Sequence, residues 1–207
     1  MTKTHIALAL LTSTIACTSA HAQTTTSQTQ PPIGFGGHLA YVSNDAGSGS
    51  DLDGSLRFEG FGQLQFAPNL ALEVGISHST GAEESGEDNT GSYKLEISST
   101  DYFAGLRIDT QPWGAINGYG RAGVLYYHST IDFEESFFDI KPGGDLEEIE
   151  EGTGFYLEGG IALQIAPGAK LDAGITWRNR QDYFEDSIRP FDMKELGATI
   201  GIVFTTR

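Results

Sequence analysis

The chain has one cysteine, few basic residues and no apolar run long enough to cross a bilayer as a helix. Its 207 residues include 12 Lys and Arg against 28 Asp and Glu, a formal net charge of −16. Nucleic-acid phosphates need Lys and Arg as partners, so this balance argues against nucleic-acid binding. A spanning helix needs at least ~18 apolar residues. If the protein lies in a membrane, it must therefore cross as strands.

The first 22 residues have the features of an export signal. Lys3 precedes an apolar run over 6–16, which has the length of a secretory apolar region but is too short to span a bilayer. Ala20-His21-Ala22 follows as an A-x-A cleavage site, in which Ala20 and Ala22 are the signal residues. We therefore expect residues 1–22 to be removed; a buried N-terminal helix is the alternative.

The single cysteine, Cys17, lies inside this segment. It would begin a mature lipoprotein, but Thr14-Ile15-Ala16 lacks the leucine usually found three positions upstream. Without Cys17 the mature chain has neither a disulfide nor a thiolate metal site, although it is exported. Residues 23–32 are rich in Thr, Gln and Pro and are expected to form a flexible leader to one domain over 33–207.

Beyond residue 33 the apolar and polar residues alternate with a period of two, which predicts β-strands. Leu56 and Phe58 share one face of such a strand, and Arg57 and Glu59 share the other. The eight segments with this pattern are 33–42, 56–66, 70–77, 100–109, 119–128, 155–164, 171–178 and 195–204. Their length is close to the ~9–11 residues of a tilted transmembrane strand. The phase slips at Leu95 and Ile97, which indicates a bulge or the end of the lipid zone.

The connections between these segments alternate in length. Those without any acid are short: 67–69, 110–118 and 166–170. Those rich in acid are long: 44–55, 80–94, 129–152 and 180–192. This is the pattern of eight antiparallel strands with both termini on one side. Outer-membrane barrels have short periplasmic turns and longer outer loops.

A fourteen-residue stretch occurs twice without gaps. Residues 65–78 align with 164–177, and six positions are identical. Each copy is expected to form a strand end, a tight Pro turn and a return strand. A two-stranded hairpin alone is marginal in water, so the two copies indicate a larger meander.

Charges of both signs recur on one face of the predicted strands, which is also rich in small residues. We expect them to line a barrel interior as a polar network: Arg57, Glu59, Glu73, Arg107, Asp109, Arg121, Glu158, Asp172, Arg178 and Glu195. The opposite, apolar face carries no charge, as the cost of roughly 2–4 kcal/mol for an Arg or Lys at mid-bilayer requires. Aromatic residues near the strand ends fit interfacial girdles: Phe35, Tyr41, Phe66, Tyr126, Phe155, Trp177 and Phe204.

The sequence thus predicts an all-β fold, an eight-stranded antiparallel up-and-down transmembrane β-barrel, with a secreted soluble barrel or sandwich as the alternative. Eight strands enclose a lumen just wide enough for side chains, so a structural network is favoured over a pore lining. In the expected register of the second repeat, Arg178 lies diagonal to Glu158. We predict that these two side chains pair.

Four segments carry a resemblance to a known family: 69–75, 102–107, 119–123 and 197–204. With the export signal and the meander, they make residues 33–207 similar to the small outer-membrane barrels of the OmpA-transmembrane-domain and OmpX type, the outer membrane protein beta-barrel domain group. The resemblance implies a monomer surrounded by outer-membrane lipid and lipopolysaccharide and folded by the barrel assembly machinery. Members usually finish on an aromatic residue, whereas Phe204 is followed here by three more residues.

Three histidines remain after cleavage, and two of them precede a serine: His78-Ser79 and His128-Ser129. A Ser-His-acid hydrolase, such as a lipid A-modifying outer-membrane enzyme, is one alternative function. Adjacent His and Ser do not reproduce the His-x-Ser spacing of those enzymes. We therefore expect no catalytic residue and no cofactor.

The loop predicted over 129–152 is the most acidic of the four. Its acids are Asp132, Glu134, Glu135, Asp139, Asp145, Glu147, Glu148, Glu150 and Glu151. They could bind Ca²⁺, attract a basic extracellular protein, or share divalent cations with lipopolysaccharide. The order of an EF-hand is missing, so no fixed metal site is predicted. The expected function is non-enzymatic: envelope structure, or surface interaction and adhesion through long acidic loops. A narrow porin-like channel is the other alternative.

Overall fold

A computed structural model describes residues 32–45, 51–87, 91–137, 145–183 and 191–206. The predicted signal peptide with Ala20 and Ala22, nearly all of the predicted leader, and Asp139 lie outside these ranges. In the part that the structure describes, no helix is long and apolar enough to cross a bilayer.

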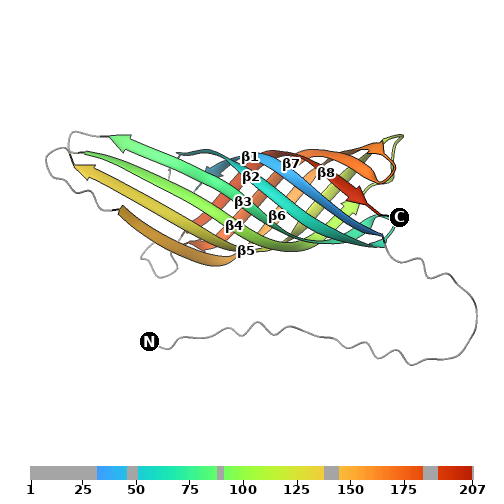
Figure 1. Cartoon of the computed structure of the whole chain (residues 1–207), viewed down its shortest axis with the longest axis horizontal. Coiled ribbons are helices and arrows are strands. Elements are labelled where there is room, and N and C mark those ends of the chain that lie inside the picture. The colour runs from blue at the N-terminus through green and yellow to red at the C-terminus, as the bar shows by residue number, and fades with distance from the viewer. Residues whose placement is uncertain (1–31, 46–50, 88–90, 138–144, 184–190, 207) are drawn as a thin grey trace, which may run out of the picture. The chain divides into compact units, whose positions relative to one another are not determined.

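The described chain forms eight β-strands that close into a barrel (Figure 1). They are β1 (Ile33–Asp45), β2 (Asp51–Ala67), β3 (Leu70–Glu87), β4 (Gly91–Asp109), β5 (Ile116–Phe137), β6 (Asp145–Ala166), β7 (Ala169–Tyr183) and β8 (Phe191–Thr205). Each strand pairs antiparallel with the next, and β8 returns to pair with β1. Closure satisfies the backbone within the sheet, as hydrocarbon requires. The predicted eight-stranded up-and-down barrel is confirmed.

In the part of the barrel nearer the short turns, charged and polar side chains point into the lumen and the outer surface is apolar. Val124 and Ile175 are 65% and 64% exposed, whereas Arg57 and Glu73 are 1% and 0% exposed. In water such a surface would be strongly unfavourable. Facing lipid it is the surface that a membrane barrel needs.

The duplicated sequence forms two equivalent hairpins, β2–β3 and β6–β7. Both end in a two-residue turn, since Ala67 pairs with Leu70 and Ala166 pairs with Ala169. Both carry a register shift one step before the turn, after Gln65 and after Gln164. In the ring of eight, two strands separate the two hairpins on either side, β4 and β5 on one and β8 and β1 on the other. The two hairpins therefore stand on opposite walls of the barrel.

The strands extend well beyond their predicted ends, so the prediction of long acidic loops is wrong in most of its extent. Asp132, Glu134 and Glu135 lie in β5. Asp145, Glu147, Glu148, Glu150 and Glu151 lie in β6. Acidic composition indicates contact with water, and paired strands can stand in water as readily as loops can.

Four strands continue further than their neighbours at the end opposite the short turns (Figure 1). The β2–β3 pairing ends at Arg57 and Ser79, but β3–β4 continues to Glu87 and Ser92. The β4–β5 and β5–β6 pairings likewise reach Phe137 and Asp145. We call residues 80–87, 91–98, 130–137 and 145–149 the outer extension.

The inner face of the outer extension carries an apolar cluster. Ala82, Ile97 and Ile131 are 2%, 4% and 5% exposed, and they pack in one cluster with Leu52 and Met193. This explains the phase slip at Leu95 and Ile97, because the apolar residues move to the inner face where the sheet leaves lipid. A register shift also occurs beside it, on β3 between Ser79 and Ala82. The structure therefore has a counterpart for both interpretations of the phase slip, the bulge and the end of the lipid zone.

Candidate functional site

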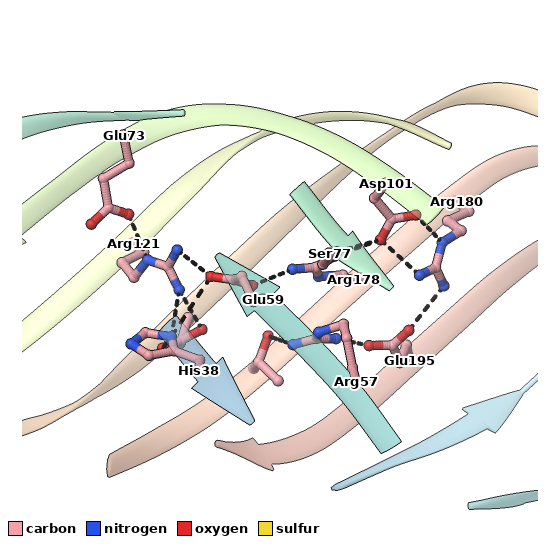
Figure 2. Close-up of polar contacts among 12 residues, drawn as sticks. His38, Arg57, Glu59, Glu73, Ser77, Asp101, Arg121, Arg178, Arg180 and Glu195 are labelled. Carbon is pink, nitrogen blue, oxygen red and sulfur yellow. Dashed lines mark hydrogen bonds and ion pairs between the residues drawn. The ribbon is translucent and has the colours of Figure 1, made fainter. Parts of the chain in front are cut away.

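The centre of the lumen is organised around one guanidinium, that of Arg121 on β5 (Figure 2). It donates from Nε to Glu73 at 2.6 Å, from Nη2 to Glu59 at 2.5 Å and from Nη1 to Glu158 at 2.9 Å. Nη1 also lies 3.0 Å from Nδ1 of His38. Phe61 packs on the same guanidinium, with its ring centre 4.7 Å from Cζ. Three carboxylates from three strands thus share one cation.

A chain of ion pairs runs from Glu59 toward the outer end (Figure 2). Arg178 donates from Nη2 to Glu59 at 2.6 Å and from Nη1 to Asp101. Arg180 donates from Nε to Asp101 at 2.9 Å and from Nη1 to Glu195 at 2.9 Å.

This chain of ion pairs ends at Glu195, which also pairs with Arg57. Arg57 in turn donates from Nη2 to Thr176 Oγ1 at 3.1 Å. These four arginines, Arg57, Arg121, Arg178 and Arg180, are 0–2% exposed. A network that joins opposite walls at this burial fills the section of the lumen that it occupies.

A second group lies nearer the short turns. Arg107 binds Asp172 through both terminal nitrogens, at 2.5 and 3.3 Å, and binds Asp109 through Nε at 3.0 Å. Lys170 donates to the other oxygen of Asp109 at 2.8 Å. His38 lies between the two groups, with Nε2 3.4 Å from Asp172.

All ten residues predicted for the interior network point into the lumen. Nine are buried, and Asp109 is half-buried at the short-turn end. Sequence reasoning missed His38, Asp101 and Arg180. Asp101 had a usable signal, since it precedes Phe103 on the inner face of β4. Arg180 was assigned to a loop because no alternation continues past Trp177.

The predicted Arg178–Glu158 pair is wrong. Glu158 bonds to Arg121, its direct neighbour across the β5–β6 pairing, and accepts a 2.8 Å hydrogen bond from Tyr119. Arg178 instead reaches across the lumen to β2 and β4. A diagonal pair on adjacent strands was the reasonable choice for an open sheet, but closure brings the far wall within reach of a long side chain.

The outer extension carries ten acids and a single cation, Lys94. Its acids are Glu83, Glu84, Glu87, Glu96, Asp132, Glu134, Glu135, Asp145, Glu147 and Glu148. Lys94 lies 3.3 Å from Glu83 and 3.2 Å from Glu96, and hydrogen bonds to Glu96 and Glu83 raise the pKa of Lys94. The remaining acids leave this region strongly negative.

The histidine–serine neighbours do not form nucleophile–base pairs. Ser79 and Ser129 point inward and are buried, whereas His78 and His128 lie on the outer face. Alternation along a strand enforces this separation. His78 contacts Thr100 at 3.1 Å, and His128 contacts Glu151 at 2.9 Å. Within the described ranges, no three His, Cys, Asp or Glu side chains gather as metal ligands.

Comparison with known proteins agrees with this architecture. Neisserial surface protein A superposes with a TM-score of 0.56 at 12% identity, over 83% of this chain and 96% of that chain. Ail, the attachment invasion locus protein of Yersinia pestis, gives 0.51 at 13%, over 86% and 99%. The outer membrane protease OmpT from Escherichia coli gives 0.55 at 12%, over 88% and 99%.

At such identities these likenesses show the fold alone. No curated protein matches the chain in sequence. The family model for the outer membrane protein beta-barrel domain matches residues 8–204, almost the whole chain. The chain therefore belongs to the outer membrane protein beta-barrel domain family, and its place is the outer membrane.

Proposed function

We propose that this protein is a non-enzymatic outer-membrane barrel that binds positively charged partners at the cell surface through its acidic outer extension. The observation that carries the proposal is the outer extension itself, in which four paired strands rise past the barrel around a buried apolar cluster and carry ten acids against one lysine. The negative charge of the extension attracts such partners, and this attraction becomes stronger as the ionic strength falls.

The acids of the extension are held on a rigid surface. Asp132 and Glu147 are exposed and face each other on β5 and β6. Like charges that face each other across a strand pair repel, so these two acids destabilise the β5–β6 pairing when no partner is bound. A basic partner relieves this repulsion. Because the acids stand on paired strands, little conformational freedom is lost on binding.

The extension also offers an open sheet edge. Beyond Ser79, β3 has no described partner on its β2 side, since Thr80 Oγ1 accepts from Leu56 N and marks the last contact. Glu83 and Glu87 stand along this edge and are exposed. An extended basic segment of a partner could add there as a further strand.

The filled lumen favours a structural role over a porin-like channel. Arg121 alone bonds to four side chains on four other strands. Opening a water path would separate these buried charges from their partners. We expect purified protein to give no discrete conductance steps in planar bilayers. Stepwise conductance would favour the porin alternative.

Binding is tested with a fluorescent lysine-rich peptide and cells that express the protein. The double variant Asp132→Asn with Glu147→Gln should lower peptide binding several-fold, and added salt should lower wild-type binding further. Asp53→Asn with Asp192→Asn is the matched control, since it removes two acids from β2 and β8, outside the extension, and should change binding less. Equal effects of both double variants, or binding that is insensitive to salt, would contradict the proposal.

The remaining parts of the proposal have separate tests. Export with cleavage after Ala22 predicts that the mature protein begins at Gln23, as N-terminal sequencing would show. A non-enzymatic role predicts a lipid A mass spectrum that is the same with wild type and with His78→Ala or His128→Ala. The monomer expected of such a barrel is checked by its mass in detergent.

A further inference from the structure

A cavity of about 680 Å³ opens at the short-turn end of the barrel, opposite the outer extension. Pro68, Pro112 and Gly168 of the three short turns contribute to its rim. Arg107 and Asp109 of the second ion-pair group also line it. Its size is typical of small-molecule and peptide sites. In the barrel family this end faces the periplasm.

Five side-chain amides line the cavity, Asn69 among them, and the orientation of the other four follows from their hydrogen bonds. Gln63 Nε2 donates to Glu73 at 2.6 Å, and Gln65 Nε2 donates to the Pro68 carbonyl at 2.7 Å. Gln164 Nε2 donates to the Ala169 carbonyl at 2.9 Å, and Asn117 Nδ2 donates to the Gly118 carbonyl at 3.1 Å.

Each of these four amide nitrogens is directed at an oxygen, and no donor from the described residues reaches the four amide oxygens. An amide nitrogen has two N–H groups, and among the four only Gln164 uses both, on the carbonyls of Ala166 and Ala169. Asn117 is only 7% exposed, so its oxygen has little access to bulk water except through the cavity. The cavity therefore offers free amide oxygens together with free amide N–H groups, the two kinds of group that pair with a peptide backbone.

Lys170 is the more exposed of the two cations that line the cavity, and its ammonium has donors to spare. Its ammonium has three N–H groups. One of them serves Asp109 at 2.8 Å, and no other acceptor for it lies among the described residues. Arg107, by contrast, is occupied by Asp109 and by both oxygens of Asp172.

The sequence repeat explains how this lining arises. Gln65 and Gln164 are equivalent positions of the two copies, and each braces its own Pro turn on opposite walls. Ala71 and Lys170 are equivalent as well, and both line the cavity. The two walls thus share this glutamine and differ in one cation, which gives the cavity a direction.

We propose that this cavity binds the carboxyl-terminal end of an extended peptide from the periplasmic side. The carboxylate accepts from Lys170, and the peptide N–H groups donate to the free amide oxygens. A saccharide fits less well, because none of the described residues that line the cavity is an aromatic that could stack on a sugar ring. This site is independent of the outer extension, at the other end of the barrel.

The test uses the full mature protein in detergent micelles and two probes, acetyl-Ala-Ala-Ala as the free acid and as the carboxyl-terminal amide. Binding is followed by the NMR shifts of the Gln65 and Gln164 side-chain amides. The free acid should move both signals, and the amide should bind about tenfold more weakly, as loss of a charge-assisted hydrogen bond implies.

Variants separate the site from its surroundings. Lys170→Met should weaken free-acid binding about tenfold and remove the difference between the probes, whereas Lys170→Arg should keep it. Lys94→Met, at the opposite end, is the matched control and should bind like wild type. A gel shift on heating confirms that each variant is folded. Absence of shifts at millimolar peptide, equal binding of both probes, or unchanged binding by Lys170→Met would overturn the proposal.

Discussion

The barrel and the outer extension share four of the barrel's eight strands, yet the two regions are inverted with respect to each other. On β5, Arg121 is buried and Val124 is exposed in the barrel, whereas Ile131 is buried and Asp132 is exposed in the extension. The backbone alternates in the same way in both. What changes is the surrounding medium, which is lipid for the first region and water for the second.

The comparison shows that one continuous strand can be stable with one part of its outer face in lipid and another part in water. In lipid the outer face must be apolar, and the polar residues can meet only inside. In water the outer face can be charged, and the inner face gains by burying apolar area. Three tests sharpen or break this contrast, each with a matched change in the other region.

The largest effect is expected from removal of the central cation. Arg121→Leu leaves Glu59, Glu73 and Glu158 buried without their shared partner, which should lower the free energy of unfolding by roughly 3–5 kcal/mol. The free energy of unfolding is measured by urea unfolding in lipid vesicles, followed by tryptophan fluorescence. Lys94→Leu removes a cation that also pairs with two acids, but in water, and should leave the midpoint unchanged. Similar losses for both would remove the distinction between the regions.

The next effect comes from a charge placed on the outer face. Val124→Arg faces lipid and should destabilise the barrel by roughly 2–4 kcal/mol. Ile149→Arg, equally on the outer face but in the extension, should change stability by less than about 0.5 kcal/mol. The same vesicle unfolding experiment compares them. A large loss for Ile149→Arg would mean that lipid reaches higher than the inverted pattern indicates.

The smallest effect is local. Ile131→Ala leaves a cavity in the apolar cluster of the extension and should lower its local opening free energy by about 2 kcal/mol. Hydrogen exchange should then speed up for amides near Ile97 and stay unchanged near Arg121. Val124→Ala is the counterpart, since lipid can fill the space that it leaves, and its effect should be smaller. Faster exchange throughout the barrel would show that the two regions unfold together.

The sequence predicted the faces of the strands better than their lengths. Period-two alternation correctly placed Arg57, Glu73 and Arg178 on the inner face of their strands. The same rule stopped at residue 128 of β5, because beyond it the apolar residues lie inside and the acids were attributed to a loop. Leu95 and Ile97 were the visible sign of the inversion. One rule for which residues face inward therefore fails where the strand passes from lipid into water.

The contacts of the candidate sites were less predictable. Arg180 and Asp101 meet from β7 and β4, and Lys170 meets Asp109 over 61 residues of sequence. Such partners depend on how far the strands are staggered when the barrel closes. The duplicated Gln65 and Gln164 could be seen in the sequence, but the cavity between them exists only because the two hairpins stand on opposite walls.

By itself, the sequence determined that the chain forms strands, that they number eight, and that the charges within the barrel lie on the inner face. These properties follow from alternation along a strand and from the cost of a charge in hydrocarbon, and both act on each strand separately. Only the tertiary structure decided which carboxylate each arginine meets, where the outer extension begins, and that an acceptor-lined cavity opens at the short turns. Those features arise when strands far apart in sequence are held at one level of a closed barrel.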